Sequence, residues 1–556
     1  MAMPWLNHRM KNFLVIPVLS IFGIVAAIGA WRVATGRGLW SEAKEPATSA
    51  AVHAQANQLD TKQPEVKPAG ERASNSTPQA ETPIPEIPPE ALIAAQTDAN
   101  IVALISDYII KKDELEEELI RELQPYDYDP PSADSLKSEP ADANEVLTRM
   151  AAEKAMIMEG RKNGVLGTEM IFNTVKQFRE RQLVNHLMQG QVAGRLTVSE
   201  AEIAEKMKVR LGTAGAADPK LDRDKAESAV KRAKANTIMS TYYDELYKKS
   251  DVKKATANFT KAAEIHHRLL LRPIAKRDVG FIRNSQIKNE LTEAEKNIVM
   301  ATFNGGKVTL KDWFETINEI APPSRPRDLN TEAGVDRLLE RALRTPVLVA
   351  EAIRLRLDEN ETLKKQVREY EDMNLLGDAR QRAGKQVSEP NAAQIKAYFD
   401  EHKDEFRQGQ KLKVDQIWCE QLKAAQTVKA ELDEGKDFAS VKQAHSLDKE
   451  GKISDIYPGA EAYFWPELWK GDPNTVVGPV KGMYRNEFKW RVVKILEKHP
   501  GTIPEFSEKS TDRVKRTMQS KQRRAALEQY HRELLKKYTH KIYADRIKDI
   551  NPLDIP

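Results

Sequence analysis

The hydrophobic pattern divides the chain into segments of three kinds. Residues 13–31 form an uninterrupted apolar run without a charged residue. Apolar and polar residues largely alternate along 413–418 and again along 488–495, which predicts two strands, because successive side chains of a strand face opposite sides. Elsewhere apolar residues recur at the spacing of an amphipathic helix, as they do from Leu339 to Ala350. The pattern therefore predicts a mostly helical α+β chain behind an apolar N-terminal segment.

The apolar run at 13–31 predicts a transmembrane helix. A helix of about 20 apolar residues matches the thickness of the bilayer core, and Trp31 and Arg32 are residue types that anchor helix ends at the membrane interface. A cleaved signal peptide is the alternative, with residues 25–27 as a small-residue cleavage site. We favour an uncleaved single-pass anchor in the inner or plasma membrane, with residues 1–12 in the cytoplasm and the bulk of the chain periplasmic or otherwise extracytoplasmic.

Residues 32–95 predict a disordered linker. From Ser41 onward the composition shifts to Ala, Glu, Pro, Ser, Thr and Gln, and large apolar residues are scarce. Such a segment cannot bury enough apolar surface to offset the entropy lost on ordering. Its expected role is to let the folded part act at a distance from the membrane.

Two later segments share one order of elements, which predicts an internal repeat. Each copy opens with a short apolar run, a turn, a second apolar run and an acidic helix start, at 101–115 and at 298–314. Both copies also carry a polar helix start before a later amphipathic helix, at 197–200 and at 388–391. The shared order predicts two related helical modules.

Each copy has a candidate closing helix, which is implied by the resemblance to a family of chaperone modules described below. Residues 224–249 are the candidate closing helix of the first copy, and residues 506–543 are the candidate for the second. The predicted segments are the cytoplasmic N-terminus (1–12), the transmembrane helix (13–31), the linker (32–95), the first helical module (96–257), a connector (258–297), the second helical module (298–407), a small α+β domain (408–500) and a C-terminal helix that completes the second module (501–556).

The small α+β domain carries four motifs in a recognisable order. These are the strand at 413–418, the helix start EGKDFASV at 434–441, the segment VVGPVKG at 476–482 and the closing strand FKWRVVKILE at 488–497. The domain resembles the parvulin-type (PpiC-type) peptidyl-prolyl isomerase domain. The resemblance implies a fold whose first and last strands pair.

The helical modules resemble the N-terminal chaperone module of the SurA, PpiD and PrsA foldases. That module combines a short opening strand, several helices and a late helix returned by the C-terminal end of the chain. The resemblance implies a membrane-tethered foldase with two modules of this type and a parvulin-like domain inserted in the second. It also implies that the partners are unfolded or nascent exported polypeptides, met near the translocon.

The positions of the family's two histidines carry other residues here. Prolyl isomerisation is rotation about a partial double bond with a barrier of about 20 kcal/mol, and a catalyst needs an apolar pocket and polar groups that hold the twisting carbonyl. The resemblance places one histidine on the first strand and one on the last, where this chain has Gln416 and Arg491. The family's glycine-rich turn is replaced by residues 452–460. These replacements count against catalysis at the candidate positions Gln416 and Arg491.

Apolar side chains of the domain are candidates for a peptide-binding groove, and the alternative is that they form its core. The candidate substrate-binding residues are Trp418, Phe464, Trp465, Leu468, Tyr484, Phe488 and Trp490.

Charge and cysteine content narrow the functional classes. Charged residues make up 31% of the chain, the net charge is +4, and the two signs are interspersed. A nucleic-acid binder would concentrate Lys and Arg on one face, so we do not predict nucleic-acid binding. The single cysteine, Cys419, excludes an internal disulfide and a cysteine-based zinc site. Adjacent histidines at 266 and 267 point in different directions, and there is no phosphate-binding glycine loop, so we predict neither a metal nor a cofactor.

Three hypotheses for function follow. The favoured one is a chaperone that holds unfolded exported chains and delays their aggregation. The alternatives are an active peptidyl-prolyl isomerase and a non-enzymatic envelope scaffold that binds one folded partner.

Overall fold

The computed structural model describes residues 86–123, 141–214, 219–271, 281–553 and 555. The predicted transmembrane helix at 13–31 and the predicted linker as far as residue 85 lie outside these residues. Within the described ranges, no helix combines the length and the apolar character needed to cross a bilayer. The described chain is mostly helical with three small antiparallel sheets, as the pattern predicts for the α+β class, and it divides into two compact units.

Among the described residues, the first unit contains 175–367, and the second contains 86–174 together with those from 368 onward. Helices α5 (Glu169–Val192) and α13 (Glu361–Lys385) each begin in one unit and end in the other. The further elements of the first unit are α6 (Glu200–Ala214), α7 (Pro219–Lys249), β3 (Lys253–Lys254), α8 (Phe259–Leu271), α9 (Asn284–Glu290), α10 (Glu293–Lys296), β4 (Val299–Phe303), β5 (Gly306–Thr309), α11 (Leu310–Glu319) and α12 (Glu332–Arg354).

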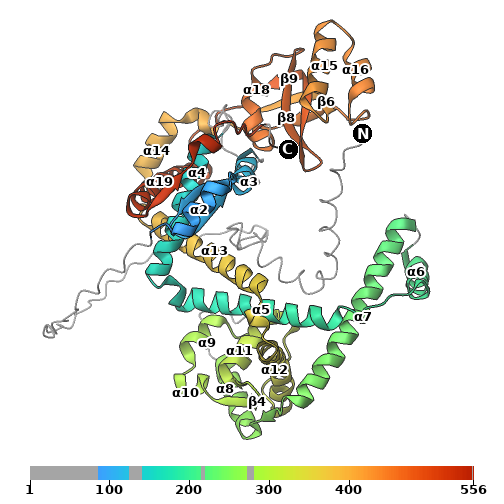
Figure 1. Ribbon diagram of the computed structural model, residues 1–556, viewed down its shortest axis with the longest axis vertical. Coiled ribbons are helices and arrows are strands. Elements are labelled where there is room, and N and C mark those ends of the chain that lie inside the picture. Colours follow the sequence, from blue (N-terminus) through green and yellow to red (C-terminus); the bar gives the residue numbers. More distant parts are fainter. Residues whose placement is uncertain (1–85, 124–140, 215–218, 272–280, 554, 556) are drawn as a thin grey trace, which may run out of the picture. The chain divides into compact units, whose positions relative to one another are not determined.

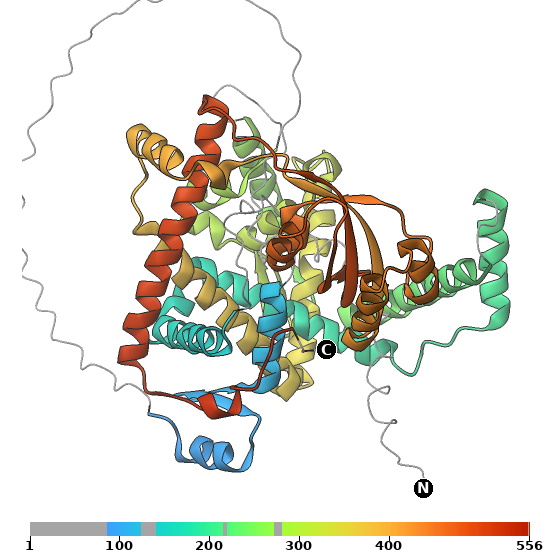
Figure 2. The same cartoon turned by 90° about the horizontal axis from the view of Figure 1, so that it is seen from above.

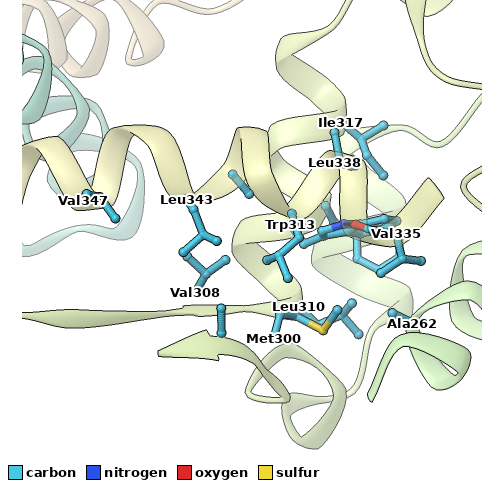
Figure 3. Close-up of a cluster of buried hydrophobic side chains, with 14 of the residues drawn as sticks. Ala262, Met300, Val308, Leu310, Trp313, Ile317, Val335, Leu338, Leu343 and Val347 are labelled. Carbon is cyan, nitrogen blue, oxygen red and sulfur yellow. Dashed lines mark hydrogen bonds between the residues drawn. The ribbon is translucent and has the colours of Figure 1, made fainter. Parts of the chain in front are cut away.

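The core of the first unit is built around Trp313 of α11, which is fully buried. A capping box between Thr309 and Asp312 starts this helix directly after β5. Figure 3 shows Met300 of β4 and Leu343 of α12 in the same cluster as Trp313. The Trp313 indole N–H donates to the Val335 carbonyl at 3.1 Å, so the one polar atom of the side chain is satisfied in the core.

The second unit holds a helical part and the small sheet domain. Its further elements are α2 (Pro89–Thr97), β1 (Ile101–Ile105), β2 (Tyr108–Lys111), α3 (Lys112–Leu123), α4 (Ala143–Lys162), α14 (Ala392–Glu401), β6 (Lys411–Cys419), α15 (Leu422–Asp433), α16 (Phe438–His445), β7 (Ser454–Ile456), α17 (Pro458–Glu461), α18 (Trp465–Trp469), β8 (Val476–Tyr484), β9 (Glu487–His499), α19 (Glu508–Lys537) and β10 (His540–Ile542).

The last residues of the predicted linker are part of this unit. Helix α2 begins at Pro89 and buries Ala91 and Ala95 against Ile101 and Leu104 of β1. Residues 89–95, which the prediction placed in the linker, therefore belong to the folded unit, because two alanines a turn apart give this short helix an apolar contact with β1.

The predicted repeat is visible as two hairpins of one design. Strands β1 and β2 pair from Ile101↔Lys111 onward, β4 and β5 pair from Val299↔Thr309 onward, and both ladders shift register after the first pair. Each hairpin leads directly into a helix, α3 in one case and α11 in the other. The order of strand, turn, strand and helix read from the sequence is thus present in both copies.

The closing segments differ from the prediction, because each closes the other copy. Strand β10 follows α19 and pairs with β1, and β3 follows α7 and pairs with β4. Helix α19 packs on α4, and α7 packs on α12. The C-terminal segment 501–556, predicted to complete the module at 298–407, therefore completes the sheet at 101–111, and the helix predicted to close the first copy serves the second. In Figure 2, α19 is the long red helix, and it packs on α4.

Hydrogen bonds from Arg546, which follows β10, hold the C-terminal segment against the start of the unit. The Arg546 guanidinium donates to the carbonyls of Ala95, Asp98 and Ile101 at 2.6, 3.0 and 2.6 Å. It also lies 4.2 Å from the ring centroid of Tyr543. Three carbonyls near the start of the unit thus depend on one side chain near its end, which is a physical reason for the pairing of the C-terminal segment with the first copy.

The small domain confirms the predicted pairing of its first and last strands. Its sheet has the order β7-β6-β9-β8, and all neighbours are antiparallel (Figure 1). Helices α15 and α16 cover one face, where Ile417 and Val492 are buried, and α18 packs on the other, where Val414 and Val493 are buried. The candidate positions lie on the two central strands of this sheet.

Candidate functional site

The structure brings Gln416 and Arg491 together. They lie on adjacent central strands, β6 and β9, and the register places Arg491 opposite Trp418, two residues beyond Gln416 on β6. Residues two apart on a strand share a face, so Gln416, Trp418 and Arg491 all lie on the α18 side of the sheet. The Nη1 of Arg491 donates to Oε1 of Gln416 at 2.6 Å.

A third residue, Glu461 at the end of α17, completes this cluster. Its carboxylate accepts from Nη1 of Arg491 at 3.2 Å and from Nη2 in a bidentate ion pair. Arg491 is 2% exposed and Glu461 is 8% exposed, so both charges are buried. Sequence reasoning missed Glu461, because it lies in an irregular stretch with no period. The available signal was Arg491 itself, since a charge on a central strand requires a buried partner.

Aromatic side chains and a glycine enclose the guanidinium. It lies 4.9 Å from the ring centroid of Trp418, whose ring lies 5.2 Å from that of Tyr484. On the opposite strand, a Cβ at Gly482 would come within 2.5 Å of Cζ of Arg491. The guanidinium therefore fills the space above Gly482, and a larger residue there would displace it.

The chemistry available at this cluster is that of a fixed, neutralised ion pair. Two terminal nitrogens of Arg491 are engaged by Glu461 and Gln416, and Trp418 covers the group. Freeing the guanidinium to hold a substrate carbonyl would leave the Glu461 carboxylate buried and unpaired, which costs about 3–5 kcal/mol.

The predicted substrate-binding residues do not form one exposed groove. Trp418, Phe464, Trp465 and Leu468 are buried, and the last three belong to the core between the sheet and α18. Phe488 is half-buried with its ring centroid 5.9 Å from that of Phe464, and Tyr484 is half-buried against Trp418.

Trp490 lies apart from the other candidates. It packs beside the cluster under α15 that contains Ile417 and Val492, on the face opposite Arg491. Lys481 of the neighbouring strand β8 holds its ammonium 5.5 Å from the Trp490 ring centroid. Because Trp490 immediately precedes Arg491 on β9, the two side chains cannot line the same face.

Lys442 and Cys419 are two further buried side chains of the domain that carry reactive or charged groups. Lys442 of α16 pairs with Asp415 and donates to the Gly451 carbonyl at 2.7 Å. Cys419 is buried, and burial raises the pKa of its thiol to about 11, so the thiolate form is scarce at neutral pH. Throughout the ranges described above, no group of three His, Cys, Asp or Glu side chains is placed to hold a metal ion.

The predicted connector contributes a buried histidine to the first unit. His266 of α8 stacks on Phe314, with ring centroids 6.3 Å apart, and meets the Trp313 ring edge-on. Burial lowers the pKa of His266 to about 4, so the ring is neutral at physiological pH. Its neighbour His267 is exposed and points away from the core.

Comparison with known proteins identifies the small domain. Residues 390–510 match the family model of the PPIC-type PPIase domain. The foldase protein PrsA of Clostridium acetobutylicum is 28% identical over 161 residues, which cover 28% of this chain and 46% of that protein. The parvulin-like PPIase of Rickettsia typhi is 29% identical over 111 residues, which cover 19% of this chain and 39% of that protein.

These relatives match only part of the chain. The chain spans about half the length of the first curated relatives that it matches. A solved SurA-like chaperone of Campylobacter jejuni aligns with 43% of this chain and 98% of its own, at 14% identity and a TM-score of 0.22, and we draw nothing from a score this low. The chain is thus similar to PrsA-type foldases and carries a parvulin-type domain.

Proposed function

We propose that this chain, with its parvulin-type domain at 390–510, is a membrane-tethered foldase-type chaperone that holds unfolded exported polypeptides. The match to the PPIC-type PPIase family and the similarity to PrsA foldases support the foldase class. In this proposal the parvulin-type domain binds extended peptide and does not catalyse isomerisation. The apolar run at 13–31 anchors the chain in the membrane, and the segment that follows extends the folded part toward chains leaving the translocon.

One observation carries the non-catalytic part of the proposal. The site at which the resembling family has its histidines is filled by the buried ion pair of Arg491 and Glu461 and by the half-buried Gln416. The two charges neutralise each other, and Trp418 covers the guanidinium. The Arg491 guanidinium is not free to bind a substrate carbonyl unless the ion pair opens first.

The outer strand β7 offers a surface for an extended client. It is an edge strand of the sheet, so one side of its backbone has no strand partner in the order β7-β6-β9-β8. Ile453 and Tyr457 flank it, with 53% and 46% of their surfaces exposed, and Leu447 is 44% exposed in the same segment. An extended peptide gains backbone hydrogen bonds at such an edge and apolar contacts beside it. We propose that clients bind here.

The test is the aggregation of a thermally unfolding model protein in the presence of the full-length chain. Suppression at near-stoichiometric amounts, with no effect on the same protein when folded, is the expected result. The Ile453→Ser and Tyr457→Ser double variant should weaken the suppression, and the control Ile503→Ser, which changes an exposed isoleucine outside β7, should leave it intact. Unimpeded aggregation would refute the chaperone proposal. Tight binding of one folded partner instead would favour the scaffold hypothesis.

An active isomerase is the second candidate, and the family match at 390–510 is the observation that favours it. Acceleration of cis-to-trans conversion of a proline tetrapeptide by the full-length chain would support it. In that case Gln416→Ala and Arg491→Ala should each remove the acceleration.

A further inference from the structure

A basic cleft lies between the C-terminal half of α13 and the middle of α19, both within the second unit. Its volume is about 620 Å³. The residues that line it are Arg380, Gln381, Gly384, Lys385, Val387, Glu389, Gln519 and Arg523. The Arg523 side chain lies over Gly384 of α13, because a Cβ at Gly384 would lie 3.6 Å from Cγ of Arg523. The cleft is remote in sequence from β6, β7 and β9.

The charges of this cleft are unbalanced. Three cationic side chains face one carboxylate, and that carboxylate, Glu389, is neutralised by Lys515 at 2.6 Å. Arg380 pairs with Glu153. Lys385 and Arg523 have no ion-pair partner among the residues that the structure describes. Both are exposed, so their charges are available to a ligand that enters the cleft.

The size of the cleft suits a peptide better than a small anion. Its volume falls within the roughly 300–1,000 Å³ of ordinary ligand sites, which far exceeds the space that one phosphate needs. The amide groups of Gln381 and Gln519, which also line the cleft, can donate to backbone carbonyls of a bound segment.

We propose that this cleft binds acidic, extended segments of client polypeptides. Lys385 and Arg523 pair with carboxylates of the bound segment, and the glutamine amides hold its backbone. The inference rests on the proposed chaperone function and adds a preference: clients that carry acidic stretches are retained more strongly than neutral ones. The site is distinct from the β7 edge, so a client chain can occupy both.

The test is fluorescence anisotropy of labelled peptides with the full-length chain at low ionic strength. A peptide in which glutamate alternates with serine should bind about fivefold more tightly than the same peptide with glutamine, as expected for two exposed ion pairs. The Lys385→Gln and Arg523→Gln double variant should lose this preference. The control Arg524→Gln and Arg532→Gln, which removes two exposed cations of α19 outside the cleft, should keep it.

Three outcomes would overturn the acidic-client proposal. The first is equal affinity for the glutamate and glutamine peptides. The second is a preference that survives in the Lys385→Gln and Arg523→Gln variant. The third is displacement of the glutamate peptide by inorganic phosphate more strongly than by sodium chloride of equal ionic strength, which would mark a small-anion site. In each case, suppression of client aggregation by the same preparation would leave the chaperone function standing, and its absence would remove both.

Discussion

The buried ion pair of Arg491 and Glu461 permits a quantitative prediction. The substitution Glu461→Gln keeps the size of the side chain but removes its charge. Arg491 is then a cation at 2% exposure without a counterion. Removal of one partner of a buried pair typically destabilises a protein by about 3–5 kcal/mol.

Two contacts of Arg491 survive the substitution and reduce this cost. The 2.6 Å hydrogen bond to Gln416 and the face of Trp418 at 4.9 Å still stabilise the cation. We therefore expect a loss at the lower end of the range, about 3 kcal/mol, confined to the parvulin-type domain. Replacing both charges with apolar residues, as in Glu461→Leu with Arg491→Met, should recover most of it, because apolar replacements of buried pairs are near neutral.

The assay is hydrogen exchange followed by mass spectrometry on peptides from β6 and β9. It reports the free energy of local opening, which suits a chain of two compact units that need not unfold in one step. Glu461→Gln should speed exchange in these strands and leave peptides of α11 and α12 unchanged. Unchanged protection in β6 and β9, or a double variant as unstable as the single one, would refute the reasoning.

Three further predictions concern other contacts. The pKa of His266 is about 4 in the folded chain against 6.5 for an ordinary histidine, so the unfolded chain protonates first. The stability that His266 contributes is complete above about pH 6.5 and declines by about 3 kcal/mol as the pH falls to 4. In unfolding curves measured across this range, His266→Leu should flatten that decline and His267→Gln should not. Arg546→Ala leaves three carbonyls without their donor, and faster hydrogen exchange in β1 with no change in β4 is expected. Gly482→Ala forces the guanidinium of Arg491 to move, and a loss of about 1–3 kcal/mol in the same exchange assay is expected.

Local periodicity predicted much of the secondary structure. The hairpins at 101–111 and 299–309 and the helix α16 were visible in the spacing of apolar and polar residues. The contact between Gln416 and Arg491 followed from two central strands that pair. Secondary structure depends on residues close in sequence, and the pairing of two strands depends on one register. The spacing of apolar and polar residues along the chain can reveal both.

The partners of the closing helices were not accessible in this way. Helices α7 and α19 were assigned to the modules by their order along the chain. Their actual partners are set by two very short strands, β3 and β10, and by the hydrogen bonds of Arg546. Glu461 was missed because it lies in an irregular segment. Trp490 could have been separated from the groove by strand alternation alone, because its neighbour Arg491 faces the other side.

The rate of prolyl isomerisation tests the central claim most directly. The full-length chain is mixed with a proline tetrapeptide, and the cis-to-trans rate is compared with the uncatalysed rate. A site filled by Arg491, Glu461 and Gln416 predicts that the two rates are equal at every concentration at which the chain still suppresses aggregation. An acceleration that grows with protein concentration and disappears in Gln416→Ala would contradict the account.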